Sequence, residues 1–316
     1  MNFAELKEEV LSVEHEGITY QKTIYKNATT ITGVTDEQYP EYSETQKYLH
    51  GDNVIVPELK SIYRSTIGTI EEPNVGNFPC LENSEKWVWF GYVNSANMFA
   101  LDENIGAKTV GTDVVMTMDF NQCNILSFVD CKFHLLTVSQ KCNTTQEVTK
   151  SVISGKDISF DDFAEYCFKP TKQKRKVILD LEWLPSSTVT LTFTGDMSIG
   201  TLGIGREEEL GFNIIGNLLT WESQSKFDVN QFTGFRTVLR KGSVRVLSAE
   251  LIVDTNNFNS TAMRADEIFD RYMLWIPTKK DVFAENIDIG YLENFSMKAN
   301  NQSIPTQCKI VGVPTK

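Results

Sequence analysis

Histidine is scarce in this sequence, and the three histidines stand far apart, as His15, His50 and His134. A metal site or a catalytic triad that depends on histidine therefore has few residues to draw on. His15 lies between two glutamates and is interpreted as part of an exposed charged segment. The chain also lacks an apolar run of about 18 residues, which a membrane-spanning helix requires. Histidine-based catalysis and a membrane span are both disfavoured.

Closely spaced cysteine pairs are missing as well, and we expect the thiols to be buried and reduced. None of the cysteines belongs to a Cys-x-x-Cys motif, and their spacing is not that of a small disulfide scaffold. The six residues are Cys80, Cys123, Cys131, Cys142, Cys167 and Cys308. The first eleven residues carry four charged side chains and no apolar core, so no signal peptide is predicted. Synthesis in a cytosol is the expectation.

The sequence has an excess of acidic residues. Its formal net charge is −12, from 42 acidic and 30 basic residues. This balance repels the phosphate backbone of nucleic acids, so nucleic-acid binding is disfavoured. Hydrophobic residues make up 41% of the chain, which is enough to build packed cores. The length of 316 residues predicts two or three domains.

Apolar residues alternate with polar residues in many short segments. In the clearest one, Val189, Leu191 and Phe193 alternate with threonines, which places one face of a strand inward and the other in water. Similar runs, separated by turn residues, occur at 114–120, 125–129, 133–138, 177–181, 244–253 and 308–313. The pattern predicts a mainly β fold of antiparallel sheets arranged as sandwiches or barrels.

Changes in pattern divide the chain into four predicted segments. They are an N-terminal arm at 1–46, a small three-stranded module at 47–92, a jelly-roll-like β-sandwich at 93–195 and a C-terminal β-rich domain at 196–316. One or two short helices are expected in the β domains.

Helical spacing is found in three places. Phe3, Leu6 and Val10 predict a short helix at the start of the arm. A helix is predicted at 261–274, ending before Pro277 because proline cannot continue a helix, and a second short helix at 160–168.

The densest glycine and acidic clusters do not indicate a nucleotide site. Gly200, Gly203 and Gly205 resemble a phosphate loop in spacing, but the Gly-Lys-Ser/Thr ending is missing and Glu207–Glu209 follows. The glycines are therefore expected to form a turn. The acidic runs Asp161–Asp162 and Glu207–Glu209 are typical of helix starts or loops. Two carboxylates that cleave a glycosidic bond need no fixed sequence spacing, so a polysaccharide-cleaving enzyme stays an alternative.

Aromatic residues are dense in the 47–92 module. Tyr48, Tyr63, Trp87 and Trp89 could stack on sugar rings or contact a partner protein, or they could fill the core of a very small domain. Trp87 and Trp89 share one strand face, while Val88 and Phe90 share the other, so one face is expected to be covered by a neighbouring domain. No catalytic residue, metal ligand or cofactor site is predicted.

The order of the motifs resembles known proteins. The residues Pro40-Glu41-Tyr42, Tyr48 to Ile55, Ile62 to Ser65, Gly76-Asn77, Pro79 and Trp87 to Gly91 resemble the small chitin-type carbohydrate-binding modules. The continuation from Val93 to Asp102 and through Lys108-Thr109 resembles structural proteins of tailed bacteriophages, in which such a module leads into a β-sandwich. The C-terminal third is similar to the same phage proteins in its segments 195–216, 235–243, 274–276, 289–291 and 311–312.

The resemblance implies a virion component of the tail, at its tip or baseplate, made in the cytoplasm of a bacterial host. Its partners would be identical copies and neighbouring tail proteins, with the apolar edge around Trp87–Val93 as the contact. The alternative is a glycan-binding module that attaches the particle to the host envelope. The chain departs from the family pattern at Ser95-Ala96-Asn97, where an aromatic or basic residue is common, and this puts sugar binding in doubt.

Overall fold

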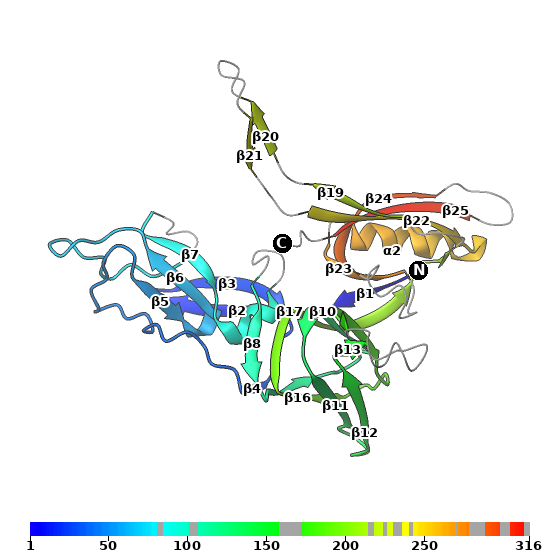
Figure 1. The fold of residues 1–316 in the computed structure, drawn as a ribbon, viewed down its shortest axis with the longest axis horizontal. Coiled ribbons are helices and arrows are strands. Elements are labelled where there is room, and N and C mark those ends of the chain that lie inside the picture. Colours follow the sequence, from blue (N-terminus) through cyan, green and yellow to red (C-terminus); the bar gives the residue numbers. More distant parts are fainter. Residues whose placement is uncertain are drawn as a thin grey trace.

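The fold is seen in a computed structural model (Figure 1). The structure describes residues 1–80, 85–100, 107–157, 172–213, 218–223, 226–229, 236–239, 243–269, 271–277, 288–297 and 304–312. Strands dominate, and α2 (Phe258–Ile268) is the α-helix of the described residues. Short 3-10 turns occur at η1 (Pro57–Leu59), η2 (Asn94–Phe99) and η3 (Thr255–Asn257). The prediction of a mainly β fold with a three-stranded module and a β-sandwich is confirmed. The helix predicted at 160–168 lies outside the described residues.

One sheet has five antiparallel strands in the order β12-β11-β16-β9-β4. Their bounds are β4 (Thr30–Thr32), β9 (Val115–Asp119), β11 (Leu135–Cys142), β12 (Val148–Ser154) and β16 (Ser187–Thr194). In β16 the residues Val189, Leu191 and Phe193 are buried and the threonines between them are not, as the alternation predicted.

A second sheet has 11 strands in the order β15-β10-β17-β1-β23-β24-β25-β22-β18, with β8 on β17 and β19 on β22. Five of its strands are β1 (Asn2–Leu6), β8 (Thr109–Thr112), β10 (Ile125–Lys132), β15 (Lys176–Asp180) and β17 (Asp196–Glu209). The others are β18 (Phe212–Asn213), β19 (Leu218–Ser223), β22 (Ser243–Val253), β23 (Met273–Ile276), β24 (Asp288–Met297) and β25 (Ile304–Gly312).

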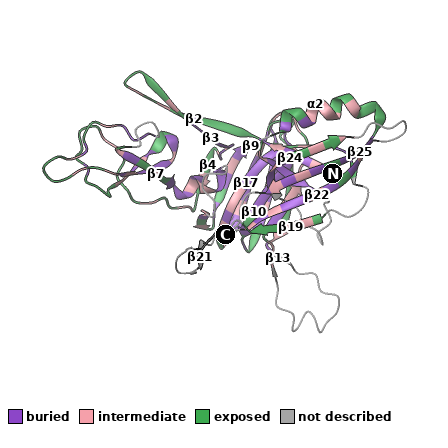
Figure 2. Cartoon of the chain, turned by 90° about the horizontal axis from the view of Figure 1, so that it is seen from above, coloured by how far each residue is buried: buried purple, intermediate pink, exposed green. Residues whose placement is uncertain are grey.

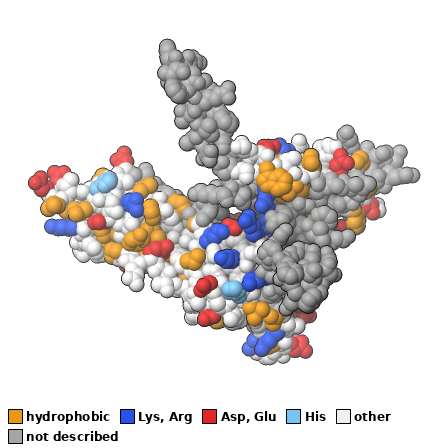
Figure 3. Space-filling view, in the orientation of Figure 1, with side chains coloured by type: hydrophobic (Ala, Val, Ile, Leu, Met, Phe, Trp, Pro, Cys, Tyr) orange, Lys and Arg blue, Asp and Glu red, His pale blue; other side chains and the backbone are white. Residues whose placement is uncertain are grey.

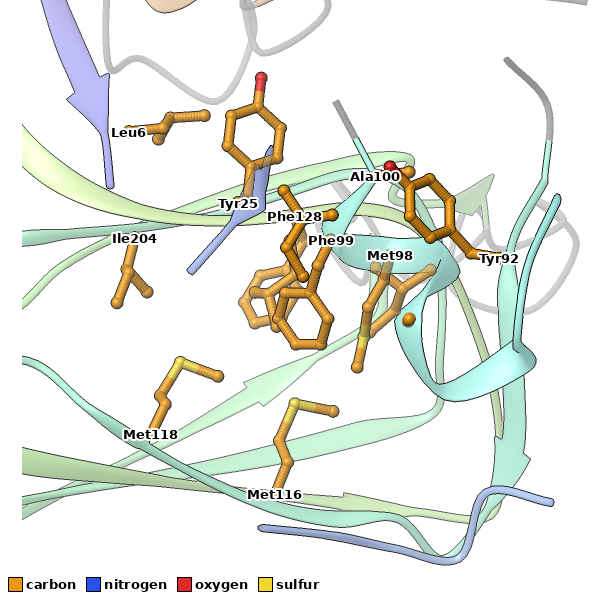
Figure 4. Packing of buried hydrophobic residues seen from close by; sticks show 14 of the residues in the cluster. Leu6, Tyr25, Tyr92, Met98, Phe99, Ala100, Met116, Met118, Phe128 and Ile204 are labelled. Atoms are coloured by element: carbon orange, nitrogen blue, oxygen red, sulfur yellow. The ribbon is translucent and has the colours of Figure 1, made fainter. Parts of the chain in front are cut away.

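The five-stranded sheet and the β10-β17 part of the larger sheet form the sandwich. Met116 and Met118 of β9 lie in one core with Phe128 of β10 and Ile204 of β17 (Figure 4). The rings of Phe128 and Phe193 lie 6.0 Å apart, edge to face. Figure 2 shows buried residues concentrated in β10, β17 and β22. Removing this apolar surface from water is what holds the two sheets together.

The boundary predicted at residue 195 falls inside this sheet. β17 follows the boundary in sequence but pairs with β10 and β8, which precede it. The turn at Gly195 connects β16 to β17, and a turn in the sequence does not show which sheet the next strand joins. The C-terminal unit is therefore built on the strands that follow β17.

Strand β1 lies where a helix was predicted, and it has an apolar cluster on each face. Phe3 belongs to the cluster under α2, whereas Ala4 and Leu6 belong to the cluster of the sandwich. The helical spacing of Phe3, Leu6 and Val10 was misleading because Val10 is 55% exposed and lies in the next strand, β2 (Glu8–His15). β1 pairs with β17 on one side and with β23 on the other, so it joins the two halves of the large sheet.

The glycines of β17 lie inside a strand of 14 residues, so the predicted turn is wrong. A Cβ atom at Gly205 would lie 2.4 Å from the carbonyl oxygen of Glu5, and one at Gly203 would lie 2.8 Å from the side chain of Leu6. The glycines therefore allow β1 to approach β17 closely. The acidic run Glu207–Glu209, expected in a loop or helix start, continues β17 and pairs with β1.

Helix α2 ends at Ile268, earlier than predicted, and the following apolar residues form β23. All four residues of β23 are buried, with Met273 and Trp275 in the cluster under α2 and Leu274 and Ile276 in the sandwich cluster. A central strand that is apolar on both faces reads in sequence like a buried helix segment, which explains the error.

An ion-pair network joins α2 to the large sheet. Arg264 of α2 pairs with Glu208 of β17 at 2.6 Å, and it lies 3.8 Å from Glu5 of β1. Arg271 contacts the same Glu5 at 3.3 Å. These charges fix the helix over the place where β1 enters the sheet.

Smaller sheets complete the fold. The small module contains β5 (Asn53–Val56), β6 (Ser61–Ser65) and β7 (Trp87–Tyr92) in one antiparallel sheet. Two-stranded sheets are formed by β2 with β3 (Ile18–Tyr25), β13 (Lys156–Asp157) with β14 (Lys172–Gln173), and β20 (Lys226–Val229) with β21 (Arg236–Leu239). The predicted N-terminal arm is thus divided among the large sheet, the β2–β3 hairpin and the five-stranded sheet.

Candidate interaction surfaces

Three of the four aromatic residues singled out in the sequence form the core of the small module. Tyr48 and Tyr63 are 2% exposed and Trp87 is 1% exposed. The rings of Tyr48 and Trp87 lie 5.3 Å apart, and the Trp87 indole N–H donates to the carbonyl oxygen of Asn77 at 2.8 Å. The Tyr48 hydroxyl accepts from the backbone N–H of Ser43 at 2.7 Å. A sugar ring has no access to these faces in this structure.

Trp89 is half-buried, and its ring is covered by the β2–β3 hairpin. The ammonium group of Lys22 on β3 lies 3.8 Å from the centroid of Trp89 and 4.5 Å from that of Tyr92. A cation over an aromatic face is attracted by the negative potential of the ring. The sequence predicted that one face of β7 is covered by a neighbouring domain. In the structure the covered face is the one with Trp89, and the covering element is the β2–β3 hairpin.

The tip of the same hairpin packs on the module through His15, which sequence reasoning had taken as part of an exposed segment. The His15 ring stacks on Phe78 at 4.5 Å, and its Nε2 lies 2.7 Å from a carboxylate oxygen of Glu44. The Tyr20 ring also stacks on the Phe78 ring, with 5.2 Å between the ring centroids. Burial, followed by the negative charge of Glu44, raises the pKa of neighbouring Tyr42 to about 12. The alternation of Leu11, Val13 and His15 along β2 could have indicated this buried face.

We call the opposite side of the module the outer face: it has the exposed residues Val88 and Phe90 and the half-buried residues Asn53, Ile55 and Arg64. Phe90 is 50% exposed and Val88 is 46% exposed. The guanidinium carbon of Arg64 lies 4.1 Å from the Phe90 ring centroid, and Arg64 Nε donates to Asn53 Oδ1 at 2.9 Å. A register shift between β6 and β7 at Ile62 and Tyr63 bends β7 here. The exposed aromatic residue of β7 is thus Phe90, which was not among the four predicted candidates.

Large apolar side chains are also exposed at several open sheet edges. They are Val148 and Val152 on β12, Phe212 on β18, and Leu218 and Trp221 on β19. Edge strands with exposed apolar residues are common sites of association with another chain.

No group of three His, Cys, Asp or Glu side chains within the described ranges is placed to hold a metal ion. The five described cysteines are buried, as predicted, and Cys167 lies outside the described residues. Burial raises the pKa of Cys131 to about 12 and that of Cys308 to about 11, so these two thiols are weak nucleophiles. A cavity of about 200 Å³ is lined by Glu5, Leu6, Lys7, Glu8, Arg271, Tyr272 and Met273.

Among the described residues, no helix combines the length and apolar character that crossing a membrane requires.

Comparisons with known proteins do not place the chain in a family. No family model, no curated protein and no solved structure matches this chain. The resemblance to tail proteins of bacteriophages stays a prediction from the sequence.

Proposed function

We propose that this protein is a structural component of a bacteriophage tail, at its tip or baseplate, and that it acts by assembling with copies of itself and with neighbouring tail proteins. The observation that carries the proposal is the β20–β21 hairpin. Its two strands pair with each other and with no other strand of the described residues, and the hairpin projects from the body of the molecule (Figure 1).

The stability of such a hairpin depends on what it packs against. A lone two-stranded hairpin is at best marginally stable in water, because it lacks a third strand or a packed layer. A hairpin that leaves the body of its own molecule gains stability when it packs against another surface. In an assembly, a neighbouring molecule can provide this surface. In this proposal the protein is no enzyme, because the function resides in rigid sheets and their contacts.

Replacing residues 226–239 with a short Gly-Ser linker tests the proposal. The wild-type protein is expected to form multi-copy particles in size-exclusion chromatography with light scattering, and the shortened protein to lose them. The thermal unfolding of the two sheets should not change, because the hairpin pairs with neither of them. The matched control replaces the exposed module loop 69–72 with the same linker, which should leave assembly intact. A wild-type protein that is monomeric at every concentration and absent from purified virions would refute the proposal.

A second candidate function, glycan binding for attachment to the host envelope, is favoured by the outer face of the module. Phe90 presents an exposed ring beside the side chains of Arg64 and Asn53, and such a set can stack on a sugar and bind its hydroxyl groups. Phe90→Ala should then release the protein from insoluble chitin or bacterial cell-wall polysaccharide, whereas Ile70→Ala, at a 90% exposed residue outside this face, should not. Equal retention of both variants, or no retention of the wild type, would exclude this function.

A further inference from the structure

The negative charge of the chain is concentrated in its first part. Residues 1–92 contain 15 acidic and 7 basic residues and so carry −8 of the net charge of −12. The remaining residues are nearly balanced. The segment of residues 1–92 is therefore acidic, and a neighbour that binds to its surface should present basic groups.

The β2–β3 hairpin belongs to this acidic segment, and one of its faces is open. Leu11, Val13 and His15 face the module, while Val10, Ser12 and Glu14 on the same strand are exposed. Glu16 at the turn is exposed too, and Val10 is 55% exposed. The cationic side chain of Lys22 pairs across from Leu11 and lies over Trp89, on the covered face. The open face thus combines the apolar side chain of Val10 with the carboxylate of Glu14, and Glu16 lies next to it at the turn.

Strand β12 has the opposite charge. It is an edge strand of the five-stranded sheet, and its residues from 148 to 152 are all exposed. Val148 is 50% exposed and Val152 is 64% exposed. Lys150 lies between them on the same face, and Lys141 of β11 is the cross-strand partner of Val148. Figure 3 shows hydrophobic and basic side chains next to each other at this tip of the molecule.

The lysine in the middle of β12 restricts what can bind at this edge. A charged residue on an edge strand prevents pairing between like edges, because two copies of β12 side by side would bring lysines together. The same lysine favours an acidic partner. The nearby carboxylate of Glu147 is exposed as well, and it accepts a hydrogen bond from the Thr145 hydroxyl at 3.2 Å within the turn.

We propose that the open face of the β2–β3 hairpin of one copy docks on the β12 edge of a second copy. Glu14 and Glu16 would lie against Lys141 and Lys150, and the exposed valines of β12 would cover Val10. In Figure 1 β12 lies at a tip of the molecule, away from the β2–β3 hairpin, so the contact is made between copies. Because it joins two different surfaces, it builds a ring or a filament. The inference rests on the proposed function, for which it supplies one interface.

A charge exchange tests the contact. Lys150→Glu and Glu14→Lys, made separately, are each expected to weaken self-association at least about tenfold in sedimentation or light-scattering measurements. An equimolar mixture of the two variants should associate again, because the glutamate introduced in one variant can then meet the lysine introduced in the other, while the native pair forms at the alternate contacts. Lys47→Glu and Glu71→Lys make the same charge changes at exposed positions of the module and should have no effect.

The outcomes separate this interface from the proposed function. If the wild type assembles and neither charge reversal weakens it, the interface is wrong and assembly by other surfaces stands. If each variant is weakened but the mixture is not restored, the two residues do not face each other and the pairing is overturned. If the wild type is monomeric at low ionic strength, where attraction between opposite charges is strongest, the inference falls together with the proposed function.

Discussion

Replacing Trp275 with alanine is expected to lower the free energy of unfolding by about 3–5 kcal/mol, the usual cost of removing a buried tryptophan. Trp275 is 0% exposed, its indole N–H donates to the carbonyl oxygen of Gly290 at 2.9 Å, and its ring lies 5.8 Å from that of Phe3. The substitution leaves a cavity and an unpaired buried carbonyl. Because β23 lies between β1 and β24, the loss of stability should affect both halves of the large sheet.

Denaturant unfolding followed by far-ultraviolet circular dichroism measures this effect. Trp183→Ala is the matched control, since the Trp183 side chain is 52% exposed. A surface substitution of this kind usually changes stability by less than about 0.5 kcal/mol. Equal unfolding midpoints for the two variants would show that the cluster under α2 contributes little to the stability of the protein.

Replacing Trp87 with alanine is expected to unfold the small module, at a cost again of about 3–5 kcal/mol. The module is small, and Trp87 packs edge to face against both Tyr48 and Tyr42. Few other side chains are available to fill the cavity. Loss of structure confined to the module should appear as rapid proteolysis within residues 47–92, while the sandwich stays protected.

Val88→Ala is the control for Trp87→Ala. Val88 is the next residue of β7 and lies on the outer face of the module, where it is 46% exposed. Its protease resistance should equal that of the wild type. The opposite result, in which Trp87→Ala keeps its protease resistance but loses binding to polysaccharide, would mean that Trp87 binds sugar and that the structural role assigned to it is wrong.

The strands with one buried face could be predicted from the sequence. In β16 each buried residue is followed by a threonine, because one face packs in the sandwich and the other meets water. The crowding of aromatic residues in the 47–92 module likewise indicated a small core, and Tyr48, Tyr63 and Trp87 fill it. Short-range alternation contains this information because it depends only on neighbouring residues.

Strands with two buried faces could not be predicted in the same way. β1 and β23 are apolar on both sides because their partners come from distant parts of the chain, and their sequences then resemble helix segments. The role of Gly203 and Gly205 also depends on a distant strand, since only the approach of β1 makes a side chain at these positions a clash. The exposed Phe90 was not selected because the sequence shows two apolar faces of β7 and does not show which one the hairpin covers.

The position of β1 has a consequence for how the chain folds. Leu6 pairs with Gly205 and Asn2 pairs with Ile276, so this strand contacts residues that are synthesised long after it. Contacts between residues so distant in sequence slow folding, because the loop entropy must be lost before the contacts form. During translation β1 cannot pair before β17 and β23 have been synthesised. The edges of β17 and β23 that flank β1 stay unpaired until β1 inserts between them. We expect nascent chains to need protection from aggregation in this interval, and the last step of folding to be the closure of the large sheet around its first strand.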